Sequence, residues 1–136
     1  MKFEIFSREE VQQYESSIPH VNISIHGTNQ PKAILSQNDL GRHATLFIEY
    51  DDIDKLIPGY QLFTREDAKK IISFFNEWKD KVGMFVINCE AGIARSSATA
   101  AALAIINRQS DSFVFRSDYY RPNMFVYRTI LNEWNK

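Results

Sequence analysis

One segment of the chain combines an apolar run, a tight turn and the start of a helix: Val86-Ile87-Asn88-Cys89-Glu90-Ala91-Gly92-Ile93-Ala94-Arg95-Ser96-Ser97. The apolar residues 84–87 predict a buried strand, and residues 96–108 predict a helix. Between them lie the only cysteine, a glycine and an arginine, with the spacing Cys-x5-Arg-Ser. A strand that turns sharply into a helix leaves backbone N–H groups pointing inward, where they bind anions. The segment therefore predicts an anion-binding loop that contains a cysteine.

Cys89 and Arg95 give this loop its chemistry. Inward N–H groups and the partial positive charge at the start of a helix favour a thiolate over a thiol, which makes Cys89 a candidate nucleophile. The planar guanidinium of Arg95 is suited to binding two oxygens of one phosphate. A loop that approaches a ligand closely needs a residue with free backbone angles, and Gly92 provides it. The residues expected to surround the phosphate are Glu90, Ala91, Gly92, Ile93, Ala94 and Arg95.

The rest of the chain predicts alternating strands and helices. Apolar patterns indicate strands over residues 2–6, 21–25, 45–50 and 84–87. Capping signatures and helical spacing indicate helices that begin near Ser7, Thr64, Ser96 and Pro122, the first of which ends near Ser17. We expect residues 26–42 to be a loop, and residues 109–120 to hold a short helix and a loop. This order is typical of a single-domain α/β protein with a mostly parallel central sheet and helices on both faces.

The segment around Cys89 resembles the signature loop of cysteine-dependent protein tyrosine and dual-specificity phosphatases. The resemblance covers most of the chain, because the strand end at 47–52, the helix over 64–78 and the Arg121-Pro122-Asn123 helix start lie where small members of the family carry them. It implies that residues 1–136 form one dual-specificity-like domain, with the phosphate-binding loop between a central strand and a buried helix. It also implies that Ser96 donates a hydrogen bond to the cysteine sulfur, although a serine there can also cap the helix.

A phosphatase of this kind needs a general acid in addition to its nucleophile, Cys89. The thiolate attacks phosphorus, a carboxylic acid protonates the departing oxygen, and water then hydrolyses the cysteinyl-phosphate. The acidic cluster 51–54 follows the predicted strand 45–50, and Asp52 lies 37 residues before Cys89, a spacing similar to that in small family members. We therefore expect Asp52 to be the acid, with Asp51 as the second candidate and Asp54 as the third. The alternative is a solvated acidic turn without a catalytic role.

One departure from the family pattern leaves other functions open. The residue before the cysteine is usually histidine, and here it is Asn88. The main alternative to an enzyme is therefore a phosphate- or phosphoprotein-binding module, a pseudophosphatase. A third hypothesis is a phosphatase for phosphoinositides or RNA 5′ ends, but such substrates favour lysines in the loop, whereas Glu90 would repel extra phosphates. Phosphotyrosine is the first substrate to expect, and phosphoserine, phosphothreonine or a small phosphorylated metabolite stay open.

Composition limits the classes of protein and partner. A net charge of −1 gives no field that recruits nucleic acid or an anionic membrane, and no apolar run reaches the length of a membrane span. A single cysteine excludes an internal disulfide and a multi-thiolate zinc site. The three histidines are scattered, so we expect structural or surface roles for them, no metal and no cofactor. We expect a cytoplasmic protein whose partners are a phosphorylated protein or small phosphomonoester, and whose loop binds phosphate, sulfate or vanadate.

Overall fold

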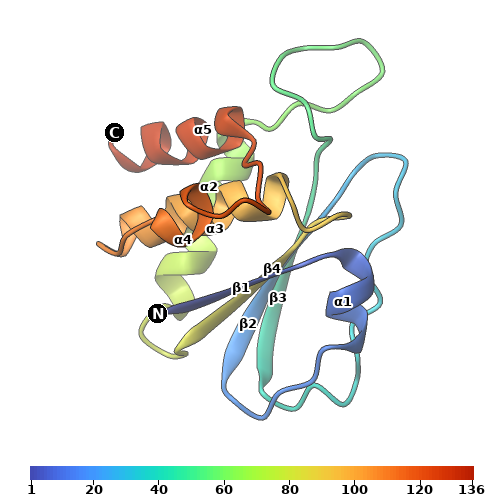
Figure 1. Ribbon diagram of the computed structural model, residues 1–136, viewed down its shortest axis with the longest axis vertical. Helices are drawn as coiled ribbons and strands as arrows, with labels where there is room; N and C mark the ends of the chain where they lie inside the picture. Colours follow the sequence, from blue (N-terminus) through green and yellow to red (C-terminus); the bar gives the residue numbers. More distant parts are fainter.

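Four parallel strands form the sheet of the protein, in the order β1-β4-β2-β3. The computed structural model describes all residues, 1–136 (Figure 1). The strands are β1 (Lys2–Phe6), β2 (His20–His26), β3 (Arg42–Glu49) and β4 (Met84–Asn88). The helices are α1 (Arg8–Gln13), α2 (Arg65–Trp78), α3 (Arg95–Ile106), α4 (Ser112–Phe115) and α5 (Met124–Trp134). The predicted α/β class, the parallel sheet and the interior position of the strand before Cys89 are confirmed.

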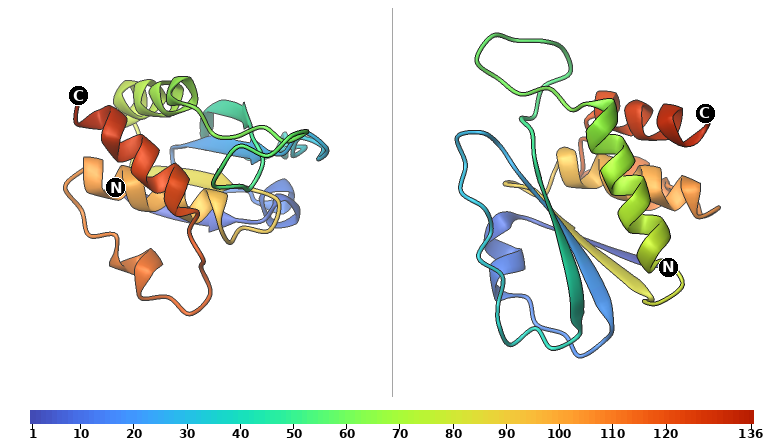
Figure 2. Two further views of the ribbon diagram at one scale, coloured as in Figure 1. Left: turned by 90° about the horizontal axis from the view of Figure 1, so that it is seen from above. Right: turned by 180° about the vertical axis from the view of Figure 1, so that it is seen from behind.

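The two faces of the sheet carry separate hydrophobic cores. Side chains of β4 alternate between them, with Phe85 and Ile87 in the larger core and Met84 and Val86 in the smaller one. α2, α3 and α5 cover the face with the larger core, and α1 covers the other face together with irregular chain around residues 33–35 (Figure 2). Helices therefore lie on both faces, as predicted, but the second face carries only one short helix.

α3 is the most deeply buried helix, because eleven of its twelve residues are buried. It packs against β1, β4, α4 and α5. Its small side chains, five of them alanines, allow the neighbouring elements to approach closely. The start of this helix, which carries Arg95 and Ser96, is therefore held firmly at the end of the central strand.

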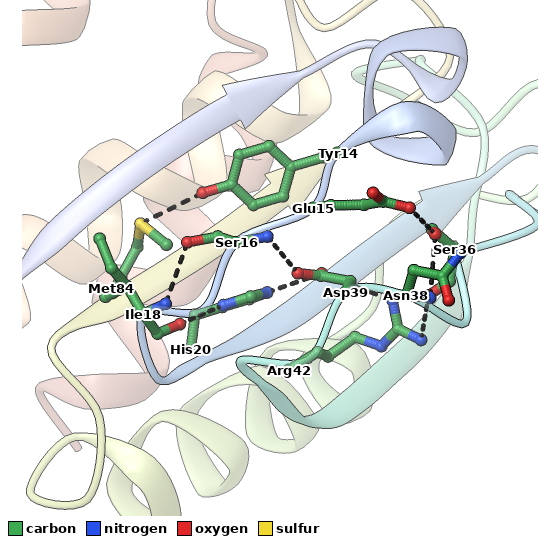
Figure 3. A network of polar contacts seen from close by, with 10 residues as sticks. All are labelled: Tyr14, Glu15, Ser16, Ile18, His20, Ser36, Asn38, Asp39, Arg42 and Met84. Atoms are coloured by element: carbon green, nitrogen blue, oxygen red, sulfur yellow. Dashed lines mark hydrogen bonds and ion pairs between the residues drawn. The ribbon is translucent and has the colours of Figure 1, made fainter.

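A buried polar network joins irregular segments of the chain at the amino-terminal end of the strands, where β2 begins (Figure 3). The Nε2 atom of His20 lies 2.8 Å from Oδ2 of Asp39, and its Nδ1 atom lies 2.7 Å from the carbonyl oxygen of Ile18. The other oxygen of Asp39 accepts from the amide of Ser16 at 2.8 Å, and Arg42 lies 3.5 Å from the carboxylate. The side chains of His20 and Asp39 are 0% and 1% exposed, so this network joins two irregular segments inside the protein.

Several element boundaries differ from those that the sequence predicts. α1 ends at Gln13 because Tyr14 adopts an extended conformation and packs its ring against Phe6, with 4.8 Å between ring centroids. α5 begins at Met124, since the side chain of Asn123 accepts hydrogen bonds from the first amides of the helix and acts as its cap. The predicted position of Pro122 in the first turn of that helix is therefore wrong. The strands β2 and β3 both begin before the predicted residues.

Candidate active site

The loop of residues 89–94 connects β4 to α3 and places Cys89 at its base. Cys89 is 2% exposed, and its Sγ atom lies 3.1 Å from the Oγ atom of Ser96. Ser96 lies in the first turn of α3 and is fully buried, so its hydroxyl is fixed beside the sulfur. This contact between the sulfur and the hydroxyl is the one that the resemblance to the phosphatases implies.

Gly92 allows the loop to lie directly against the junction of β1 and α1. Its φ angle is +71°, which disfavours any residue with a side chain. A Cβ atom on Gly92 would also lie 2.6 Å from the backbone nitrogen of Ser7 and 2.7 Å from the carbonyl carbon of Phe6. Gly92 therefore serves both the backbone conformation of the loop and its close packing on the neighbouring chain.

Glu90 is tied to α1 instead of standing free at the site. The amide of Arg8 donates to the carbonyl oxygen of Glu90 at 3.1 Å, and its guanidinium Nε donates to the Glu90 carboxylate at 2.9 Å. We expected the charge of Glu90 to repel highly phosphorylated substrates. Because this charge is paired with Arg8, its repulsion of an anion is weaker than the sequence alone suggests.

Arg95 is 6% exposed and makes two hydrogen bonds with its guanidinium. Nη1 donates to the backbone carbonyl of Tyr50 at 2.9 Å, and Nη2 donates to Oε1 of Gln30 at 3.3 Å. A guanidinium has five N–H donors, so the Nε–H and two further N–H groups remain for an oxyanion. The side chain is thus anchored by the ends of β3 and β2 while keeping donors for a phosphate.

Asp52 lies at the same site, held by the residue that caps α5. The Nδ2 group of Asn123 donates to Oδ1 of Asp52 and to the carbonyl oxygen of Ile53, both at 3.0 Å. Asn123 is 9% exposed, so the loop after β3 is fixed to the start of α5 by a buried side chain. The Oδ2 atom of Asp52 takes no part in this contact.

Asp51 has a different role in this conformation. Its carboxylate accepts hydrogen bonds of 2.7 to 3.2 Å from the amide and hydroxyl of Thr28 and from the amide of Gln61. Burial by itself would raise its pKa, but these hydrogen bonds, with the charge of Arg95, hold the pKa of Asp51 below its ordinary value. An acid that must keep a proton near neutral pH is disfavoured there, so the geometry favours Asp52.

Three of the four candidate catalytic residues line one pocket of about 460 Å³, whereas Ser96 is fully buried and does not line it. It brings together Cys89, Arg95 and Asp52, whereas Asp54 lies outside it. Of the residues predicted to surround the phosphate, only Gly92 does not line it, because Gly92 packs against the β1–α1 junction. A second pocket of about 240 Å³ and a third of about 500 Å³ adjoin the first, and Asp52 lines all three.

Three residues at the site were not predicted as functional: Gln30, Asn123 and Arg121. Gln30 lies in the segment 26–42, which carries no motif, so nothing in the sequence distinguishes it from other polar loop residues. Asn123 was recognised only as part of a helix start, and its contact with Asp52 spans 71 positions of sequence. Arg121 lines the same pocket as Cys89, and its amide donates to the carbonyl of Ile93 in the loop.

Asn88, which stands where the family usually has histidine, is buried on the sheet face that α1 covers. It is 1% exposed, and its side-chain oxygen has no hydrogen-bond partner. The hydrogen-bonding capacity of the Asn88 side chain is therefore not fully used.

Two further features of the molecule bear on cofactors and membranes. No group of three or more histidine, cysteine, aspartate or glutamate side chains is arranged to hold a metal ion. No helix combines the length and the apolar character that crossing a bilayer requires.

Comparison with known proteins identifies the fold. No family model and no curated protein matches the sequence. Among solved structures, the chain is similar to the human tyrosine phosphatase-like serine/threonine/tyrosine-interacting protein, with a TM-score of 0.64 and 16% identity over 98% of this chain and 90% of the other. Human DUSP28 is similar with a TM-score of 0.59 and 15% identity, covering 98% and 91%. PTPMT1 in complex with PI(5)P is similar with a TM-score of 0.60 and 11% identity, covering 98% and 90%. The chain therefore has the fold of the small, dual-specificity-like cysteine phosphatases.

Proposed function

We propose that this protein is a metal-independent phosphomonoester hydrolase of the protein tyrosine or dual-specificity type. The observation that carries the proposal is that Cys89, Arg95 and Asp52 line one pocket at the carboxyl end of the central strand. A nucleophile, an oxyanion clamp and an acid in one pocket are the groups that hydrolysis of a phosphate ester requires.

The first step transfers the phosphoryl group to the protein. The Cys89 thiolate forms a bond to phosphorus in line with the leaving oxygen, while Arg95 and the loop amides bind the equatorial oxygens. As the ester bond breaks, Asp52 gives its proton to the leaving oxygen, which departs as an alcohol or a phenol.

The second step returns Cys89 to its starting state. The carboxylate of Asp52 takes a proton from water, and the water oxygen attacks the phosphorus of the cysteinyl-phosphate. The sulfur–phosphorus bond breaks and inorganic phosphate is released. The hydroxyl of Ser96, 3.1 Å from the sulfur, stabilises the thiolate as it leaves.

Hydrolysis of p-nitrophenyl phosphate tests the proposal directly. Wild-type protein should hydrolyse it equally well with and without a chelator, and Cys89→Ser should be inactive. The same pair should then be assayed with phosphotyrosine, phosphoserine and phosphothreonine peptides and with a phosphoinositide, because the ligand in the similar PTPMT1 structure is PI(5)P. Loss of wild-type activity with the chelator would exclude a metal-independent reaction.

The alternative function is a phosphate- or phosphoprotein-binding module. The unsatisfied side-chain oxygen of Asn88, directly before the nucleophile, is the observation that favours it. Binding of a phosphopeptide to wild type and to Cys89→Ser separates the two functions. Binding by both proteins with no turnover of any substrate by wild type would support the module and exclude the hydrolase.

A further inference from the structure

The guanidinium of Arg95 is held at one end by two oxygen acceptors, and only one of them is a side chain. Tyr50 contributes its backbone carbonyl at 2.9 Å, whereas Gln30 contributes Oε1 at 3.3 Å. A free arginine side chain loses much rotamer entropy when it binds a ligand in one geometry. An acceptor that fixes the guanidinium beforehand reduces this loss.

The orientation of the Gln30 amide follows from the chemistry of its neighbours. Its Oε1 atom accepts from the amide of Gly27 at 2.8 Å as well as from Arg95, and both of these groups are donors only. The oxygen of the amide must therefore face them. The turn that carries Gln30 is itself fixed, because Asp51 accepts from the amide of Thr28 at 3.0 Å.

The charge of this acceptor matters as much as its position. A carboxylate in the same place would satisfy the same N–H groups, but it would also neutralise Arg95 and repel a phosphate in the pocket that Gln30 lines. A neutral amide orients Arg95 and leaves its full positive charge to the oxyanion.

We infer that Gln30 is a positioning residue, which orients Arg95 for oxyanion binding without neutralising it. The inference rests on the proposed function only in taking the oxyanion to be the phosphoryl group of the substrate. It concerns how the loop binds an oxyanion, and it holds whether or not hydrolysis follows.

Binding of inorganic phosphate and of vanadate, measured by calorimetry, tests the inference without turnover. Gln30→Ala should weaken binding about tenfold, the size expected for losing a hydrogen bond to a charged group. Gln30→Glu keeps the acceptor but adds a charge, so it should also weaken binding, more strongly at low salt than at high salt. Gln37→Ala, an exposed glutamine of the same segment, is the matched control and should bind like wild type.

The effect must also depend on Arg95. In an Arg95→Lys background, which has no Nη2 donor, Gln30→Ala should cause no further loss of binding. Equal losses in both backgrounds would show a general effect on the segment and overturn the inference, as would wild-type affinity in Gln30→Ala. Thermal unfolding shows which variants are folded, and if Gln30→Ala is not folded, the salt-dependent loss in Gln30→Glu decides. Wild type that binds phosphate but hydrolyses nothing would contradict the proposed function alone.

Discussion

At the scale of single residues, two neighbouring aspartates receive different roles from their surroundings. Asp51 is surrounded by donors from Thr28 and Gln61, whereas Asp52 receives one hydrogen bond to one oxygen, from Asn123. The sequence shows only a cluster of three aspartates in residues 51–54, so spacing alone ranks them weakly. The contacts separate them, and they do so in a way that experiments on each residue can check.

Asp52→Asn should slow hydrolysis most when the leaving group is poor. A positioned acid contributes about a hundred- to ten-thousandfold, and p-nitrophenolate needs little help in leaving. We expect the loss for phosphotyrosine to be far larger than the loss for p-nitrophenyl phosphate, with a flattened basic limb in the pH profile. Steady-state rates with the two substrates measure this. If Asp51→Asn shows this pattern and Asp52→Asn does not, the assignment of the acid is wrong.

Asp51→Asn should instead reduce stability, in a way that depends on pH. Because the pKa of Asp51 is lower in the folded state, its ionised carboxylate stabilises the protein at pH values above its ordinary pKa of 3.8. This contribution is lost as the pH falls through the lower pKa of the folded state. Wild type should therefore lose stability as the pH falls from about 5 to values below 3.8, and the variant should lose less over that range because it has no such group to protonate. Urea unfolding across this range measures the difference, and equal pH dependence would contradict the role.

The sequence predicted the site residues that belong to a recognisable pattern, including Asp52 in the acidic cluster after β3, and missed those that belong to none. Cys89, Arg95 and Ser96 fall within eight positions, so their spacing could be recognised directly. Gln30, in the loop after β2, contacts Arg95, and Asn123, at the start of α5, contacts Asp52. Both contacts depend on the tertiary fold. Nothing in their local sequence indicates which side chains they bind.

At the scale of elements, the conformation of the loop 89–94 depends on the corner between β1 and α1. Gly92 packs against this corner, Arg8 pairs with Glu90, and the amide of Cys89 donates to the carbonyl of Phe6 at 3.3 Å. The capping signature at Ser7 predicted the helix start correctly, but its role as a support for the loop was not foreseen. The helix is short because Tyr14 leaves it to pack on β1, which helical spacing in the sequence does not predict.

Alanine substitutions at three glycines distinguish the cost of backbone strain from the cost of a steric clash. Gly83→Ala should be nearly neutral, because a Cβ there meets nothing and its φ angle is not positive. Gly59→Ala adds the strain of a φ angle of +86°, which costs about 1 kcal/mol. Gly92→Ala adds the clash with Ser7 and Phe6 to similar strain, so it should reduce the unfolding free energy most and weaken phosphate binding as well. Denaturant unfolding gives the order, and a smaller effect at Gly92 than at Gly59 would contradict the packing argument.

At the scale of the whole molecule, the candidate site and the buried polar network lie at opposite ends of the parallel strands. The alternation of strands and helices in the sequence predicted the sheet and the edge at which the site lies. The buried polar network could not be predicted, because His20, Asp39 and Ser16 belong to segments that the sequence marks only as polar. Their network fastens the chain before β2 to the chain after it (Figure 3). It lies at the opposite end of the strands from Cys89, because His20 pairs with Met84 at the start of β4 and Cys89 follows the end of β4. We therefore expect it to affect stability and not the reaction.

Asp39→Asn should therefore lower the stability of the protein and leave its chemistry unchanged. An asparagine has one side-chain acceptor oxygen where aspartate has two, so the Ser16 amide and His20 can no longer both keep an oxygen partner. A buried polar group left without its partner costs about 1–3 kcal/mol. Asp80→Asn, at an exposed position, is the control and should have little effect. Because the network lies at the opposite end of the strands from Cys89, folded Asp39→Asn should have the phosphate affinity and the turnover of wild type. Both are measured at a temperature well below the unfolding transition of the variant.

A loss of turnover in fully folded Asp39→Asn would show that the network and the candidate site are coupled. Stability no lower than that of the Asp80 variant would show that the buried pair does not fasten the fold.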